Sequence, residues 1–111
     1  MELNPDSLRL YLVTDPVLCP GPALVETVTA AVRGGVRFVQ LRDKGATTRQ
    51  RIEAARVLKD ALSGTGVPLV INDDLDAAAA ANADGIHIGQ DDVTPAIARR
   101  RLGKDKIIGL S

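Results

Sequence analysis

The fold is decided by residues 67–88, which read VPLVINDDLDAAAAANADGIHI. Residues 67–71 form a short apolar run, and residues 85–88, GIHI, form a second one. Residues 75–81 between them are rich in alanine and are expected to form a short helix, which Asp73 or Asp74 is suited to cap. Near-continuous apolar strands are typical of a parallel sheet that is covered by helices. This stretch therefore predicts a strand–helix–strand unit.

The same alternation extends along the chain in both directions. Further strands are predicted at residues 9–14, 37–41 and 106–110, and further helices at residues 20–33, 47–62 and 94–102. Thr47 or Thr48 is suited to cap the second of these helices. Such an α/β pattern suits either an open doubly wound sheet or a (β/α)8 barrel. No GxGxxG motif follows the first strand, which argues against a dinucleotide-binding sheet.

The length and composition of the chain limit its function. The 111 residues are expected to form one domain, residues 1–111, with strands 1 to 5 and about four strand–helix units, whereas a full barrel takes about 250 residues. Fourteen basic and fourteen acidic residues cancel, which argues against non-specific binding of nucleic acid. No apolar run approaches the ~20 residues that span a membrane, and the polar N-terminus does not resemble a secretory signal. A single cysteine, Cys19, favours a reducing, cytoplasmic location.

Polar residues follow three of the predicted strands. They form the blocks QLRDK at residues 40–44, INDD at 71–74 and GQDD at 89–92. On an extended strand, Gln40, Arg42 and Lys44 would point the same way, and their donors suit the oxygens of a phosphate group. The alternative is a solvated strand end with incidental charges.

Carboxylates in the second and third blocks suit a divalent metal. Mg²⁺ prefers oxygen ligands and is commonly held by one or two carboxylates together with substrate phosphates. Asp73 is the candidate in the second block, with Asp74 left to cap the following helix, and Asp91 or Asp92 is the candidate in the third. His87 lies between two isoleucines, so a place in the core or the pocket wall is favoured over a role as general base.

Several motifs, in this order, resemble the thiamine phosphate synthase family. They are LYLVT at residues 10–14, GGV at 34–36, QLRDK at 40–44, INDD at 71–74, ADGIHIGQDD at 83–92 and IGLS at 108–111. The resemblance runs from residue 10 to residue 111, and the QLRDK and ADGIHIGQDD stretches are its most specific parts.

The resemblance implies a (β/α)8 TIM barrel whose site lies at the carboxyl ends of the strands. It also implies a transferase of thiamine biosynthesis, which joins hydroxymethylpyrimidine diphosphate to thiazole phosphate and releases pyrophosphate and thiamine phosphate. In this sequence Asp73 and Asp92 would hold Mg²⁺, and Tyr11 and His87 would line the pocket. The residues expected to bind the diphosphate are Gln40, Arg42, Lys44, Asn72 and Ser111.

The chain departs from the family in its length. Strands six to eight would follow in a full barrel, so we expect a fragment with two open sheet edges, which favour association into a homo-oligomer. A thiazole tautomerase-like barrel is one alternative, but a tautomerase has no diphosphate to ionise, and the cations and carboxylates named above favour the synthase. The other alternative is a non-catalytic fragment that binds Mg²⁺ and pyrophosphate without forming product.

Overall fold

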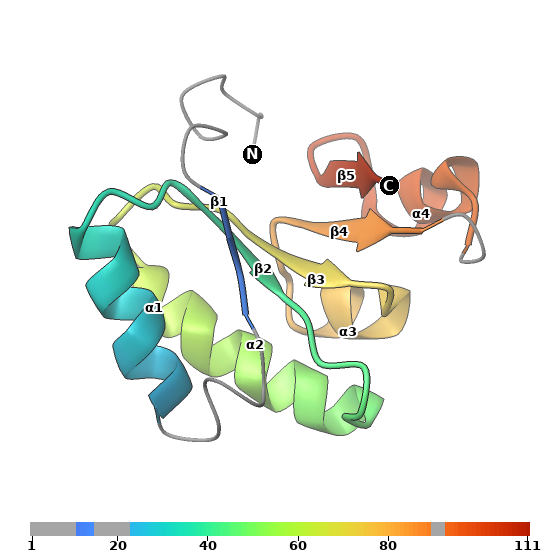
Figure 1. Cartoon of the computed structure of the whole chain (residues 1–111). Helices are drawn as coiled ribbons and strands as arrows, with labels where there is room; N and C mark the ends of the chain where they lie inside the picture. Colours follow the sequence, from blue (N-terminus) through green and yellow to red (C-terminus); the bar gives the residue numbers. More distant parts are fainter. Residues whose placement is uncertain (1–10, 15–22, 90–92) are drawn as a thin grey trace.

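The computed structural model of the chain describes residues 11–14, 23–89 and 93–111 (Figure 1). Strands and helices alternate along these residues, as the sequence predicts. The elements are β1 (Tyr11–Val13), α1 (Ala23–Arg33), β2 (Phe38–Leu41), α2 (Thr48–Leu62), β3 (Leu69–Asn72), α3 (Leu75–Ala80), β4 (Gly85–Ile88), α4 (Pro95–Leu102) and β5 (Ile107–Leu110).

The strands form one parallel sheet in the order β1-β2-β3-β4-β5, so each strand pairs with the next one along the chain. All carboxyl ends therefore meet at the same edge of the sheet. The third strand begins two residues later than predicted and ends one residue later. Asn72 is paired with His87 of β4, whereas Pro68 contributes only its carbonyl, which accepts a hydrogen bond from the Val39 N–H at 3.1 Å.

Side-chain caps fix the starts of three helices. Thr47 caps α2 in a reciprocal capping box with Gln50, and Thr94 caps α4 just before Pro95. Asp74 caps α3 through a 2.9 Å hydrogen bond from the Ala77 N–H to its carboxylate. The alternatives left open by the sequence are thus decided in favour of Thr47 and Asp74.

The two faces of the sheet differ. One face packs against residues from all four helices in a single aliphatic core, to which β4 contributes Ile86 and Ile88. Figure 1 shows α1, α2 and α3 on the same side of the strands. The opposite face carries a small separate cluster of Phe38, Val70 and Ile107. Because side chains alternate along a strand, the polar residues Gln40, Asn72 and His87 share that face. In the ranges described, no helix is both long and apolar enough to cross a membrane.

Candidate functional site

A pocket of about 710 Å³ lies on the sheet face opposite the core and extends to the carboxyl ends of the strands. Every predicted site residue that the structure describes lines this pocket. Asp92 and its alternative Asp91 lie outside the described residues. The residues brought together are Tyr11, Gln40, Arg42, Lys44, Asn72, Asp73, His87 and Ser111.

A second cavity, of about 670 Å³, lies on the helix side of the sheet. Its lining includes the apolar side chains of Leu24, Val25 and Val57, and of the predicted site residues it contains only Arg42. Polar side chains from four strand ends converge instead on the first pocket, which is the arrangement expected of a binding site in a barrel-type fold.

Tyr11 and Gln40 form one wall of the pocket. The Gln40 side chain is buried, and its Nε2 donates a hydrogen bond to the Tyr11 hydroxyl. The Tyr11 ring is stacked on Phe38, with 4.6 Å between the ring centroids. Burial raises the pKa of the Tyr11 hydroxyl, and the hydrogen bond from Gln40 offsets part of that rise. Tyr11 therefore presents a neutral hydroxyl to the pocket at neutral pH.

Arg42 and Lys44 lie beyond the end of β2, which corrects one expectation from the sequence. Because β2 ends at Leu41, the alternation of an extended strand does not explain why these two residues line the pocket with Gln40. The loop after β2 directs them there instead. Its first residue is fixed by a 3.1 Å hydrogen bond from the Arg42 N–H to the Thr14 hydroxyl. The Lys44 side chain is 63% exposed, and its Nζ lies 3.4 Å from the Asp73 carboxylate.

Asp73 occupies a turn with an unusual backbone. Its φ is 67°, and the Asp74 N–H donates to the Asn72 carbonyl at 2.9 Å, which is the hydrogen bond of a γ-turn. The Asp73 N–H donates to the His87 carbonyl of β4, also at 2.9 Å. Left-handed backbone at a residue other than glycine is strained and is concentrated at functional sites. The turn fixes Asp73 at the mouth of the pocket, beside Lys44.

His87 and Ser111 complete the pocket from β4 and the end of β5. His87 is partly buried and is paired in register with Gly109, where a Cβ atom would lie only 2.8 Å from the His87 Nδ1. Gly109 therefore leaves the space that the imidazole ring occupies. Ser111 is exposed, and its N–H donates to the Ile88 carbonyl at 3.1 Å. These contacts make His87 part of the pocket wall.

The donor groups suit a metal ion that is held jointly by the protein and a bound ligand, rather than one that is coordinated by protein side chains alone. Among the described residues, no group of three or more His, Cys, Asp or Glu side chains lies close enough to hold a metal ion. Asp73 offers one carboxylate beside the amide of Asn72, with two cations nearby. One or two carboxylates, completed by water and phosphate oxygens, is a normal set for Mg²⁺. The residues present therefore fit Mg²⁺ that is bound together with an anionic ligand.

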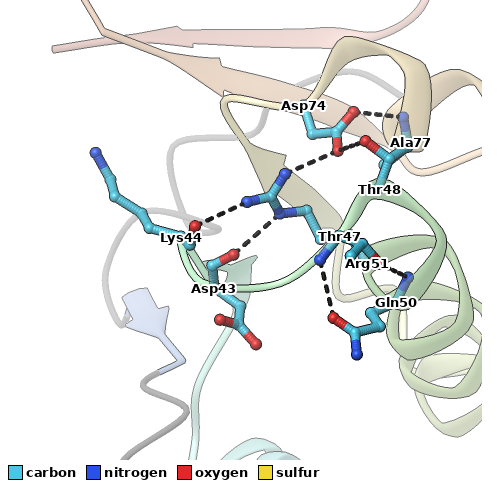
Figure 2. A network of polar contacts seen from close by, with 8 residues as sticks. All are labelled: Asp43, Lys44, Thr47, Thr48, Gln50, Arg51, Asp74 and Ala77. Carbon is cyan, nitrogen blue, oxygen red and sulfur yellow. Dashed lines mark hydrogen bonds and ion pairs between the residues drawn. The ribbon is translucent and has the colours of Figure 1, made fainter.

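Arg51, which is not among the site residues predicted from the sequence, connects the two loops of the site (Figure 2). This α2 side chain is 19% exposed. Its Nε donates to the Asp43 carbonyl at 3.0 Å, its Nη2 to the Lys44 carbonyl at 3.3 Å and its Nη1 to the Asp74 carboxylate at 3.0 Å. Nothing in the local pattern distinguishes Arg51 from the other arginines of its helix, because its carboxylate partner is remote in sequence.

Asp74 is a carboxylate near the site with several hydrogen-bond donors. Its side chain is 8% exposed and accepts hydrogen bonds from Ala77, Arg51 and the Thr48 hydroxyl, the last at 2.8 Å. Burial alone would raise the pKa of the Asp74 carboxyl, but these hydrogen bonds and the charge of Arg51 outweigh burial and hold that pKa below its ordinary value. Asp74 is therefore a charged structural residue whose oxygens are already committed.

Comparison with known proteins identifies relatives for this arrangement. The family model described as "Thiamine monophosphate synthase" matches residues 10–111. The thiamine-phosphate synthases of Xanthobacter autotrophicus and Azorhizobium caulinodans are 56% and 55% identical over 108 residues, which is 97% of this chain and 51% of each of those proteins. The solved structure of thiamine phosphate pyrophosphorylase from Pyrococcus furiosus superposes with a TM-score of 0.83 at 32% identity, over 95% of this chain and 50% of that one.

The chain thus spans about half the length of the relatives it matches. The structural match confirms the predicted fold class, five parallel strands of a TIM-barrel fold that alternate with helices. The match of the family model over nearly the whole chain confirms the resemblance seen in the motifs. The chain belongs to the thiamine monophosphate synthase family.

Proposed function

We propose that this chain supplies the diphosphate-binding side of a thiamine phosphate synthase active site. The reaction is the Mg²⁺-dependent transfer of the hydroxymethylpyrimidine group from its diphosphate to thiazole phosphate. The observation that carries the proposal is the pairing of Lys44 and Asp73, 3.4 Å apart, at the mouth of a pocket that Arg42 also lines. A cation and a carboxylate in contact there would serve a ligand that brings both phosphate oxygens and a metal ion.

The chemistry follows from the charge that develops on the leaving group. The bond between the pyrimidine methylene carbon and the diphosphate oxygen breaks with its electron pair on the oxygen, and the lone pair of the thiazole nitrogen forms the new C–N bond. Arg42 and Lys44 would stabilise the growing negative charge, which lowers the barrier when such groups are already in place. Asn72, Gln40 and Ser111 would hold the diphosphate with neutral donors. When bound by Asp73 and Asp92, Mg²⁺ supplies Lewis-acid neutralisation of that charge.

The remaining pocket residues have supporting roles in this proposal. Tyr11 and His87 would line the space for the pyrimidine. Neither is needed as a nucleophile or base, because the diphosphate leaves with the electron pair of the broken C–O bond. The thiazole phosphate would contact parts of a full-length synthase that correspond to the second half of the relatives. The edge strands β1 and β5 favour self-association, so a homo-oligomer belongs to the same proposal. A cytoplasmic location belongs to it as well, because a single cysteine is typical of a reducing compartment.

Two other functions compete with the synthase. A thiazole tautomerase-like barrel is disfavoured because it has no diphosphate to ionise, whereas Arg42 and Lys44 both line the pocket. A non-catalytic binding fragment is the second candidate, and the half-length coverage of the relatives favours it for this chain taken alone. The synthase and the binding fragment would both bind Mg²⁺ and pyrophosphate, but only the synthase would form thiamine phosphate.

The test is a calorimetric titration of the chain with pyrophosphate, with and without Mg²⁺. We expect one-to-one binding that depends on Mg²⁺ and that is lost in Asp73→Asn. The matched control is Asp76→Asn, because the Asp76 side chain is 72% exposed and pairs with Arg101 away from the pocket. Lys44→Ala should weaken binding by about 1.5–3 kcal/mol, the contribution of a hydrogen bond to a charged group. Absence of binding by the wild-type chain, or equal binding by Asp73→Asn, would overturn the assignment.

A further inference from the structure

We infer that Arg51 is a positioning residue that sets the distance between Lys44 and Asp73. It holds the loop after β2 against the N-terminus of α3 (Figure 2). This inference rests on the proposed function, since it assigns Arg51 to the same diphosphate and metal site.

One face of the site is the loop of Asp43 and Lys44, and the other is the turn of Asp73 and Asp74. Arg51 bonds both, through the carbonyls of Asp43 and Lys44 on one side and the Asp74 carboxylate on the other. The Lys44 carbonyl that it bonds belongs to the same residue whose Nζ contacts Asp73. Arg51 therefore bonds the backbone of Lys44 and the side chain of Asp74, which is the chain neighbour of Asp73.

A guanidinium group is a planar fork of donors that can bond several acceptors in fixed directions, whereas the lysine ammonium group is a compact point charge. Lysine at position 51 can keep the ion pair with Asp74 but cannot span both loop carbonyls at the same time. Arg51→Lys therefore separates the positioning of the loop from the ion pair.

Among the residues that the structure describes, few other contacts support the loop where Arg51 holds it. Its turn is closed by a long hydrogen bond, 3.3 Å, from the Ala46 N–H to the Asp43 carbonyl. The Lys44 side chain is largely exposed, so packing does not fix it. In contrast, the Asp74 end is anchored by Thr48 and Ala77. Loss of the guanidinium contacts should free the loop and leave the α3 turn in place.

The same helix offers matched controls. Arg49 is 89% exposed and pairs with Glu53 at 3.6 Å, so Arg49→Lys makes the same chemical change without touching the site. Thr48→Val removes a hydrogen bond to the Asp74 oxygen that Arg51 also bonds, but touches no loop carbonyl. Both controls should keep affinity for pyrophosphate with Mg²⁺ within about threefold of the wild type, whereas loss of a residue that orients the binding groups typically costs about 10- to 100-fold.

The experiment combines titration with pyrophosphate and Mg²⁺ and amide hydrogen exchange measured by NMR. For Arg51→Lys we expect an affinity about 10- to 100-fold lower, faster exchange at Ala46, and unchanged exchange at the sheet amide of Val39. Wild-type affinity in Arg51→Lys would overturn the inference. So would a weaker affinity accompanied by a general loss of protection in the sheet, because that result indicates a structural role only.

Failure of the proposed function is distinguishable in the same experiment. If the wild-type chain binds no pyrophosphate with Mg²⁺, the proposed function fails, and hydrogen exchange still decides whether Arg51 holds the loop. Exchange at Ala46 that is the same in wild type and Arg51→Lys overturns the positioning role. Faster exchange at Ala46 confined to Arg51→Lys, and absent from Arg49→Lys, supports it.

Discussion

Asp74 and Asp76 allow the contribution of burial to the strength of an ion pair to be measured, because the same substitution, Asp to Asn, can be made at both positions. Each carboxylate lies 3.0 Å from an arginine, Arg51 in one case and Arg101 in the other. The Asp74 pair is 8% and 19% exposed, whereas the Asp76 pair is 72% and 51% exposed. Substitution by Asn removes the charge at either position and keeps the shape. Asn is also as good a helix cap as Asp, so the cap of α3 is retained.

The expected losses of stability follow from these contacts. Asp74→Asn replaces a charged acceptor of several hydrogen bonds, and a bond to a charged group contributes about 1.5–3 kcal/mol. Breaking a fully buried ion pair costs about 3–5 kcal/mol. The loss of stability in Asp74→Asn should be smaller, because Arg51 keeps two carbonyl acceptors and is partly exposed. Asp76→Asn should cost less than about 1 kcal/mol, as exposed pairs do.

Urea unfolding of the two variants measures the difference. For a domain of this size the slope is about 1–3 kcal/mol per molar urea, so Asp74→Asn should lower the midpoint by about 0.5–3 M. The Asp76→Asn shift should be smaller, below about 0.3–1 M for the same slopes, and should vanish in high salt, which screens exposed charges. Equal shifts for the two variants would refute the reasoning, since distance alone and not burial would then determine the strength of each pair.

Three further predictions concern the pocket. Gly109→Ala should destabilise the fold by about 1–3 kcal/mol in urea unfolding, because its Cβ meets the His87 ring, and adding His87→Ala should recover most of that loss; additive effects would contradict the clash. Tyr11 is the only tyrosine and there is no tryptophan, so ultraviolet titration should show a pKa above about 10 that rises further in Gln40→Leu, and a lower value in that variant would disprove the effect of the hydrogen bond. Asp73→Gly should unfold at the same or a higher urea concentration than the wild type and Asp73→Val at a lower one, because φ is 67° at this position; the reverse order would remove the strain argument.

The parts of the fold that could be predicted from the sequence are those with local causes. Thr94 and Pro95 mark the start of α4 because capping involves only neighbouring residues. The end of β3 was misplaced because Asn72 belongs to the strand only through its pairing with His87, which is a non-local contact. The grouping of the pocket residues was predictable, since parallel strands bring their carboxyl ends to one edge.

The hydrogen bonds between residues of the candidate site could not be predicted from the sequence. Gln40 was expected as a phosphate donor, but its hydrogen bond to Tyr11 depends on the register of β1 and β2. Arg51 resembles any polar residue of an amphipathic helix, and its role appears only when α2 and α3 lie side by side. The sequence thus indicates polar residues at strand ends more readily than residues whose hydrogen-bond partners are remote in the chain.

The sheet order has a consequence for how the chain is made. Because each described strand after β1 pairs with its immediate predecessor, each of them leaves the ribosome when its partner is already synthesised. No described strand must wait for a later one to be inserted between it and its neighbour. Translation proceeds at about 5–20 residues per second, so each helix, which can form within about a microsecond, has ample time to form before the next strand is synthesised. The sheet can therefore be assembled stepwise during synthesis, one strand and its helix at a time.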